Sequence, residues 1–113
     1  MADIVYINEE EGKRRVMNNS KLYVKLLAKF KSDTSIEDLL TFADAQNWEK
    51  AQAAAHTIKG IAANLSLTEL FNQSLDLETQ IKGKSLKPDS LENFKACFNE
   101  TLVYVEKVIS KNA

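Results

Sequence analysis

The sequence predicts an all-α fold, specifically an antiparallel (up-down-up-down) four-helix bundle with a short additional helix at the N-terminus. The 113 residues include only three glycines and one proline, while helix-favouring Leu, Ala, Lys and Glu are abundant. Apolar residues recur at helical spacing in four long stretches, and no strand-like alternation competes with them. Short polar segments join these stretches, and short loops between amphipathic helices imply antiparallel neighbours.

The chain begins with a short β-branched run, Ile4 to Ile7, which is expected to lie extended over one end of the core. Asn8 precedes three glutamates and is predicted to cap a short helix toward Met17. Residues 1–17 are therefore expected to cover the bundle, which takes about residues 18–111.

A second helix is predicted to begin with Ser20 as its N-cap. Its apolar positions, at helical spacing, are Leu22, Tyr23, Leu26, Leu27 and Phe30. The segment Asp33-Thr34-Ser35 reads as a break or a bend, and Ser35 with Asp38 approximates a capping box for a further helix. The sequence leaves open whether Ser20 to Gln46 is instead one long bent helix.

Three further helical patterns complete the predicted bundle. Asn47 is expected to cap a helix whose inward stripe is Ala51, Ala55, Ile58, Ala62 and Leu65. The next helix runs from about Leu67 to Lys82 and ends at Gly83, with inward positions Leu70, Ser74, Leu77 and Ile81. Pro88 and Asp89 open the last helix, whose apolar stripe is Leu91, Phe94, Phe98, Leu102, Val105 and Ile109.

The composition and charge of the chain limit the kinds of partner and the cellular compartment that are expected. A net charge of -1 and a pI near 5.8 imply neither a nucleic acid nor an anionic membrane as partner. The N-terminus shows no secretory leader, and no apolar run approaches the ~20 residues that span a bilayer, so a cytoplasmic protein is expected. Cys97 and one histidine cannot supply an ordinary zinc site, so no metal site is predicted and Cys97 is expected to be buried. A single stand-alone domain, 1–113, is most simply a monomer.

The chain's one histidine, His56, stands three residues before Lys59 and four before Gly60. On a helix these residues share one face, which Ala63 extends. At about 100° per residue this face centres roughly 130° from the inward stripe of the same helix and should meet solvent. A neutral imidazole is a nucleophile near pH 7, and an ammonium group can hold an anion beside it, which suits a phosphoryl group. Gly60 costs roughly 1 kcal/mol relative to alanine in a helix interior and opens the surface beside the imidazole.

Several other chemistries are excluded. Glycines at positions 12, 60 and 83 cannot form a Gly-rich nucleotide lid, so the chain is not a self-contained ATP-dependent kinase. The run Gly83-Lys84-Ser85 lacks the earlier glycine of a phosphate-binding loop, because Glu78 holds that position. A hydrolase would need a nucleophile elbow, which is absent. Any phosphoryl group must therefore come from another protein or from a small donor.

The run from Ala55 to Leu65, AHTIKGIAANL, resembles the core motif of histidine-containing phosphotransfer (HPt) domains. The resemblance extends over roughly Val16 to Ile109. Its further features are a Leu/Phe-rich helix before the motif, Asn47-Trp48 at the start of the histidine helix, and Leu77-Glu78 on the helix after it. The chain departs from the family at Ser66-Leu67, where a small pair such as Gly-Ala is usual.

This resemblance implies that His56 accepts a phosphoryl group, that Lys59 neutralises its charge and that Gly60 makes room for the partner. Gln52 and Ala63 would then lie in the docking surface. The implied function is that of a phosphorelay intermediate, which takes a phosphoryl group from a receiver-domain aspartate and passes it to another in two-component signalling. The partners would be receiver domains of hybrid histidine kinases or response regulators. They would supply Mg²⁺, so the chain is expected to be a phosphoryl carrier rather than an enzyme, with no cofactor of its own.

Two alternatives stay open. A non-phosphorylated helical adaptor, or pseudo-HPt protein, would bind a receiver or another partner through the same face. It would have no need for His56, Lys59 and Gly60 together. A histidine kinase's ATP domain could also be the donor, as in the phospho-accepting domains of chemotaxis kinases. The sequence names neither the cognate receivers, nor the direction of phosphate flow, nor the response that is controlled.

Overall fold

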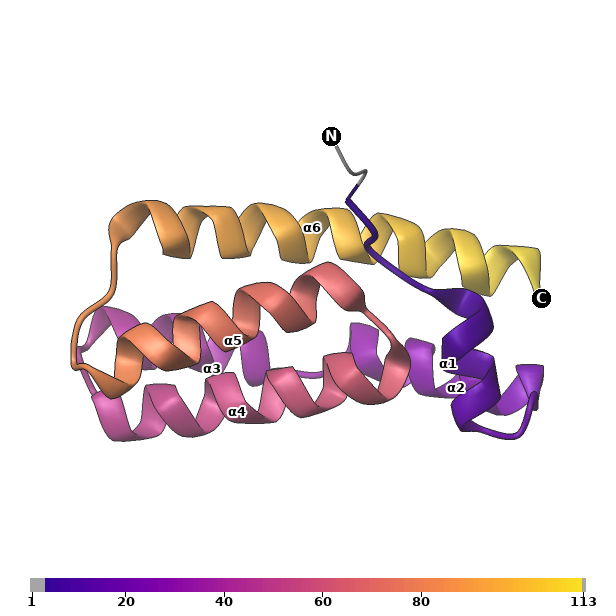
Figure 1. The fold of residues 1–113 in the computed structure, drawn as a ribbon, viewed down its shortest axis with the longest axis horizontal. Coiled ribbons are helices and arrows are strands. Elements are labelled where there is room, and N and C mark those ends of the chain that lie inside the picture. The colour runs from indigo at the N-terminus through magenta and orange to yellow at the C-terminus, as the bar shows by residue number, and fades with distance from the viewer. Residues whose placement is uncertain (1–3, 113) are drawn as a thin grey trace.

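The computed structural model describes residues 4–112, and over these residues the chain is an all-helical bundle without strands. This confirms the predicted all-α class. The first three residues and the last one of the expected 1–113 domain lie outside the described part. The helices are α1 (Glu9–Arg15), α2 (Ser20–Lys31), α3 (Ser35–Asp44), α4 (Trp48–Leu65), α5 (Thr68–Lys82) and α6 (Pro88–Lys111) (Figure 1).

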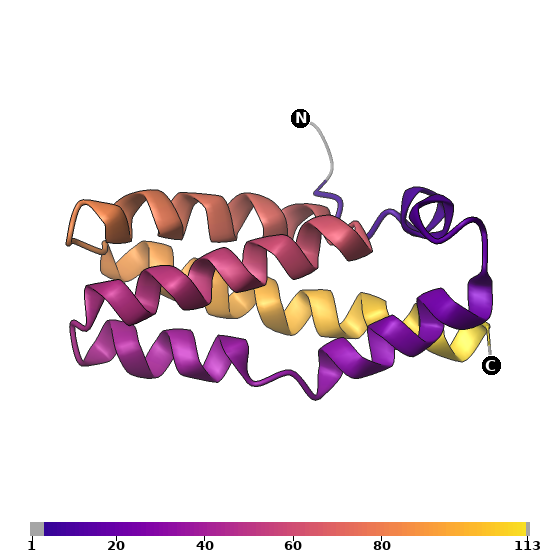
Figure 2. The same ribbon diagram turned by 90° about the horizontal axis from the view of Figure 1, so that it is seen from below.

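The long helices lie side by side, and the chain reverses direction after α3, after α4 and after α5 (Figure 2). In Figure 2, α2 and α3 follow one another along one side of the molecule, α4 returns beside them, and α5 and α6 complete the bundle. The main packing partners of α4 are α3 and α5, while α6 packs on α5 and α2. Within residues 4–112 no helix is both long and apolar enough to cross a bilayer.

Asparagine side chains cap three of the helices. Asn8 and Asn47 cap α1 and α4 as predicted, each accepting from a backbone N–H three residues on. At α2 the cap is Asn19 instead of Ser20, because the Asn19 Oδ1 accepts from the N–H of Leu22 at 3.0 Å and Ser20 already lies inside the helix.

Residues 32–34 break the chain between α2 and α3, which settles the question that the sequence left open. The predicted capping box at Ser35 is not formed. The N-cap is Thr34, which makes no side-chain capping bond, and its carbonyl accepts from the N–H of Asp38 at 2.9 Å. Just before the helix, the Asp33 Oδ1 accepts from the N–H of Ser35 at 2.7 Å. After the break α3 packs closely along α4, whereas α2 has much less contact with it.

The core follows the predicted inward stripes of α4 and α5, every member of which is buried. In α6 the predicted stripe is rotated, because the buried residues are Phe94, Cys97, Thr101, Val105 and Val108. Four predicted members are only half-buried: Leu91, Phe98, Leu102 and Ile109. The polar Thr101 can face the core because its hydroxyl donates to the Cys97 carbonyl at 2.7 Å. In α2, Leu22 is likewise exposed rather than inward.

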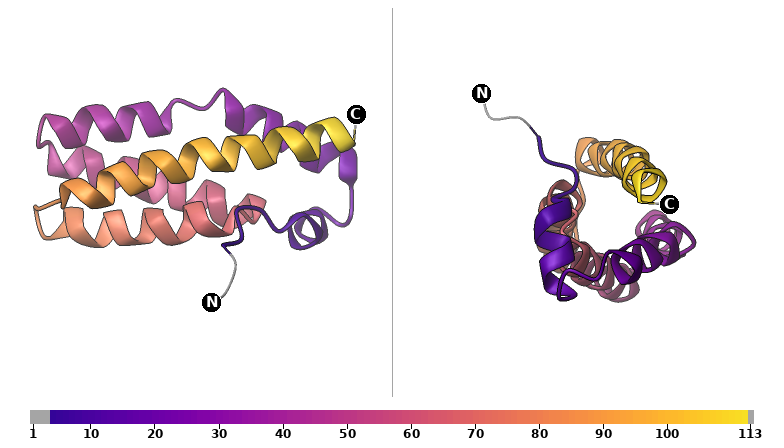
Figure 3. Two further views of the ribbon diagram at one scale, coloured as in Figure 1. Left: turned by 90° about the horizontal axis from the view of Figure 1, so that it is seen from above. Right: turned by 90° about the vertical axis from the view of Figure 1, so that its right-hand side faces the viewer.

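The N-terminal segment crosses the bundle and leads into α1, which lies at the end where the C-terminus also sits (Figure 3). Its Val5 carbonyl accepts from the N–H of Glu69, and Tyr6 stacks on Tyr104 at a centroid distance of 5.2 Å. Helix α1 packs on α2 through Gly12, which lies against the ring of Tyr23. The same tyrosine hydroxyl donates to the Leu65 carbonyl at 2.8 Å and so joins α2 to the end of α4.

Candidate functional site

His56 lies in the middle of α4, on the side opposite the buried stripe, and its side chain is 70% exposed. The placement follows from the helix itself. Ala51, Ala55 and Ala62 are fully buried, and their small side chains let α4 pack closely on its neighbours. The imidazole therefore projects from a rigid, well-packed helix into solvent, as the spacing of the motif predicts.

A glutamate on the neighbouring helix α5 organises the site. The Glu78 side chain is only 6% exposed, and its two oxygens have different partners. Oε2 lies 3.1 Å from His56 Nδ1, and Oε1 lies 2.6 Å from Lys59 Nζ. One buried carboxylate thus links both functional groups of the motif.

Lys59 differs from the expectation that it faces solvent. Its side chain is 23% exposed and turns toward α5, because Glu78 supplies a buried opposite charge one helix away. In the protein without a phosphoryl group Lys59 is paired with Glu78, so Glu78 competes with the predicted phosphoryl group for the Lys59 ammonium. Its ammonium is held close to His56 through the shared carboxylate.

The charges of Lys59 and Glu78 determine which ring nitrogen carries the proton when the His56 imidazole is neutral. The Lys59 hydrogen bond is the largest cause that lowers the pKa of Glu78, and it outweighs the raising effect of burial. Glu78 is consequently ionised at neutral pH, and an ionised carboxylate can only accept hydrogen bonds. In the neutral ring Nδ1 must then carry the proton, which leaves the lone pair on Nε2. Among the described residues nothing bonds to Nε2.

The other predicted site residues share the surface around His56. Gly60 is exposed, and a Cβ built on it would meet nothing within 4 Å. Gln52 and Ala63 are half-buried, one turn before and two turns after His56. The low surface at Gly60 leaves access to the imidazole from that side. The roles of Gln52, Gly60 and Ala63 in docking stay predictions.

Glu78 was not among the predicted site residues. In the sequence, Leu77-Glu78 stands out only as part of the resemblance to the family, although an acidic residue beside inward positions such as Leu77 and Ile81 is a usable signal of a buried carboxylate. Within residues 4–112 no three His, Cys, Asp or Glu side chains gather where they could hold a metal ion. The arrangement offers an exposed nucleophilic nitrogen, a cation close to it and a carboxylate that fixes the ring.

The departure from the family pattern at Ser66 does not prevent a tight turn after α4. Ser66 takes the left-handed conformation, with φ 57° and ψ 41°, and caps the helix. Its Oγ donates to Glu11 at 2.9 Å, and its carbonyl accepts from the N–H of Asn8 at 2.9 Å. These bonds to α1 and its cap offset the cost of a conformation that glycine adopts more readily.

The comparison with protein families agrees with this geometry. The model of the Hpt domain matches residues 26–103, which include α3, α4 and α5, the whole of the His56 motif and Glu78. The comparisons with curated proteins and with solved structures gave no match. A family match over more than half of the chain, together with the helical bundle and its exposed histidine, shows that the protein belongs to the Hpt domain family, which serves phosphotransfer in two-component signalling and interacts with receiver domains.

Proposed function

We propose that this chain is a phosphorelay intermediate, in which His56 accepts a phosphoryl group from a receiver-domain aspartate and passes it to another. One observation carries the proposal. The buried carboxylate of Glu78 binds Nδ1 of an exposed imidazole and so leaves Nε2 as the nucleophile. A histidine with only a structural role would not need a free, solvent-facing nitrogen held in one tautomer.

In the proposed step the Nε2 lone pair attacks the phosphorus of an aspartyl phosphate in line with the leaving oxygen. The P–N bond forms as the P–O bond to the aspartate breaks, and the carboxylate leaves with the electron pair. Positive charge develops on the imidazole, and ionised Glu78 stabilises it through the Nδ1 proton, which stays in place. Transfer to a second aspartate is the reverse of this step.

In this proposal the chain contributes the nucleophile, Lys59 and a docking surface that includes Gln52, Gly60 and Ala63. The receiver contributes Mg²⁺ and the acceptor aspartate, so the chain is a carrier rather than an enzyme. In this proposal the fold is an up-down-up-down four-helix bundle in which α2 and α3 together take the place of the first helix. It holds His56 rigidly enough for an incoming phosphoryl group to meet Nε2 at a fixed angle.

Labelling tests the proposal directly. The chain is incubated with receiver domains charged by acetyl phosphate and Mg²⁺, and separately with phosphoramidate, and label is followed by ³¹P NMR. We expect a phosphohistidine signal with both donors and none in His56→Gln. Undiminished label in that variant would refute the assignment of His56. Binding of charged receivers without any transfer would instead establish the adaptor.

A further inference from the structure

Charge is separated along α2 and α3, which follow one another on one side of the bundle (Figure 2). Helix α2 carries four lysines and no acidic residue, whereas α3 carries three acidic residues and no basic one. The chain as a whole is nearly neutral, with a net charge of -1. This side of the molecule therefore has a basic half and an acidic half.

Four of these charged side chains meet no opposite charge in the described part of the chain. Lys21, Lys25, Asp38 and Asp44 are exposed, and among residues 4–112 none of them forms a salt bridge. Lys21, Lys25 and Lys29 also follow one another four residues apart, a spacing at which like charges destabilise a helix. An opposite charge from another molecule would relieve this repulsion.

Two of the charges are also placed against the dipoles of their own helices. Lys21 lies in the first turn of α2, which has no acidic residue, and Asp44 ends α3, whose last turn has no basic residue. A helix carries partial positive charge at its N-terminus and partial negative charge at its C-terminus, so each of these side chains is disfavoured where it stands. Both positions would be favoured by a partner that brings an anion to Lys21 and a cation to Asp44.

A second copy of the chain brings these charges in the required order. We measure from the middle of the break, between residues 32 and 33, with about 1.5 Å per helical residue and about 3.3 Å per loop residue. Lys25 then lies about 11 Å to one side and Asp38 about 12 Å to the other, while Lys21 lies about 17 Å and Asp44 about 21 Å away. A two-fold axis through this point, perpendicular to both helices, places each lysine of one copy opposite the corresponding carboxylate of the other.

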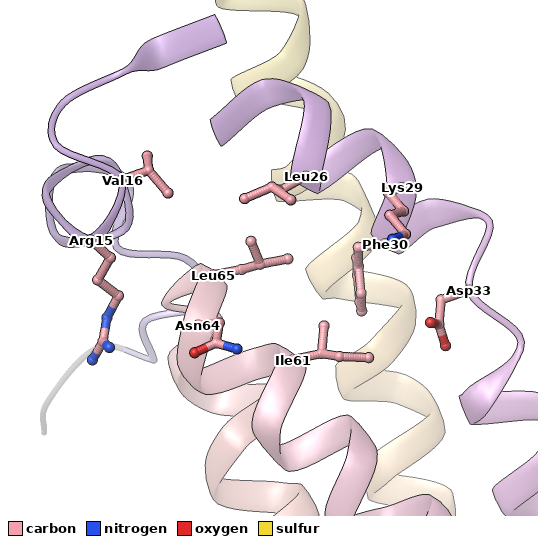
Figure 4. Close-up of a pocket in the computed structure, with 9 residues that line it drawn as sticks. All are labelled: Arg15, Val16, Leu26, Lys29, Phe30, Asp33, Ile61, Asn64 and Leu65. Carbon is pink, nitrogen blue, oxygen red and sulfur yellow. The ribbon is translucent and has the colours of Figure 1, made fainter. Parts of the chain in front are cut away.

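The charged side of α2 is distinct from its apolar side. Figure 4 shows that Leu26 and Phe30 point from α2 toward α4. At about 100° per residue, Lys21 and Lys25 lie roughly 140–180° around the helix from Phe30. The two lysines therefore face away from the bundle.

Small side chains accompany the charges, and the imidazole lies elsewhere. Ala28, Thr41 and Ala45 are exposed on α2, on α3 and directly after α3. Short side chains at the contact allow two helices to approach closely. His56 is directed from α4 toward Glu78 of α5 rather than toward α3. A copy bound on the outer side of α2 and α3 would thus leave the imidazole accessible.

We propose that two copies of this chain pair in antiparallel orientation through the outer sides of α2 and α3, with Lys25 opposite Asp38 and Lys21 opposite Asp44 in both directions. The contact is weak, because exposed ion pairs each contribute little. A strip about 40 Å long and about 10 Å wide also offers only about half of the 800 Å² that each partner buries in a stable complex. The monomer expected from the composition therefore stays the main species at micromolar concentration. The pairing does not depend on phosphotransfer.

Sedimentation equilibrium of the full chain, up to about 1 mM, tests the pairing. We expect Kd on the order of 10⁻⁴ M in about 20 mM NaCl, and at least about tenfold weaker in about 500 mM NaCl, because salt screens exposed charges. Lys25→Glu and Asp38→Lys each place like charges opposite one another, so each variant alone should raise Kd at least about tenfold. An equimolar mixture of the two variants should associate again, because every substituted position then faces an opposite charge. Lys87→Glu makes the same charge change just before α6 and should leave Kd within about twofold.

Three results would overturn the proposal. The first is a chain that stays monomeric at about 1 mM in low salt, and the second is an association that neither salt nor the substitutions weaken. The third is a mixture of folded Lys25→Glu and Asp38→Lys chains that stays monomeric. Circular dichroism checks the fold of each variant. If Asp38→Lys unfolds, mixing Lys21→Glu with Asp44→Lys decides the outcome, and Asp44→Lys should fold because it places a cation at a helix C-terminus.

Discussion

Replacing Glu78 tests whether the carboxylate tunes the nucleophile. In Glu78→Gln the amide oxygen can still accept from His56 Nδ1, but the negative charge is lost. In Glu78→Leu both the acceptor and the charge are lost. If the carboxylate fixes the tautomer and stabilises the charged ring, phosphorylation is fastest in the unmodified chain, slower in Glu78→Gln and slowest in Glu78→Leu. The unmodified chain and the Gln variant keep the proton on Nδ1, and the Leu variant does not.

The magnitude follows from the contacts. A hydrogen bond to a charged partner contributes about 1.5–3 kcal/mol when it is shielded from water. Because His56 is 70% exposed, solvent weakens this bond, and we take about 1 kcal/mol for the loss of charge, or about fivefold in rate. Loss of the acceptor as well should bring the total to about 2 kcal/mol, or about 30-fold.

The rates are measured with phosphoramidate by ³¹P NMR, so that receiver docking does not contribute. ¹⁵N NMR of the imidazole reports which ring nitrogen carries the proton, and thermal unfolding reports the fraction folded. Equal rates in all three proteins, with folded Gln and Leu variants, would refute the role of Glu78. A rate loss that merely follows the unfolded fraction would assign Glu78 a structural role instead.

Three further substitutions probe packing and charge. Gly60→Ala should raise the free energy of unfolding in urea by about 0.5–1 kcal/mol, because the new Cβ meets nothing within 4 Å. Gly12→Ala should lower it by about 1–3 kcal/mol, because the Cβ would come within 2.5 Å of the Tyr23 ring. Lys59→Met should raise the pKa of Glu78, seen by ¹³C NMR. Because the pKa of Glu78 is lowered in the folded protein, its ionised carboxylate stabilises the fold at pH values above the ordinary carboxyl pKa of 4.5, and this stabilisation is lost as the pH falls through the folded pKa. In Lys59→Met this acid-sensitive stabilisation should be smaller.

Much of the fold could be predicted because several helix ends, and the buried faces of α4 and α5, are determined by residues close to them in sequence. Asn8, Asn47, Gly83 and Pro88 act within a few residues of their own positions, and all four mark helix ends in the structure. The period of α4 placed His56 on the exposed side for the same reason. Such signals depend on backbone geometry and local hydrogen bonds, which a single sequence contains.

The remaining features depend on neighbours that are distant in sequence. The buried face of α6 shifted because the Thr101 hydroxyl is satisfied by its own helix, while Phe98 packs edge-on against Phe30 at the side of the core. The helix period could not predict that Lys59 turns toward α5, because its partner is 19 residues away. Periodicity orients a side chain relative to its own helix, whereas packing decides which charge it meets.

The shared carboxylate also bears on what happens after transfer. In the resting site the ionised Glu78 carboxylate and the Lys59 ammonium carry opposite charges, and Glu78 Oε1 lies 2.6 Å from Lys59 Nζ. A phosphoryl group on Nε2 would add about two negative charges near Glu78, with Lys59 as the cation already in contact with that carboxylate. In the proposed phosphorylated state the ring that keeps its Nδ1 proton and Lys59 carry one positive charge each, against about three negative charges on the phosphoryl group and Glu78, which leaves an excess of about one negative charge. In the proposed relay that excess would favour transfer of the phosphoryl group onward to an acceptor site that has its own cation.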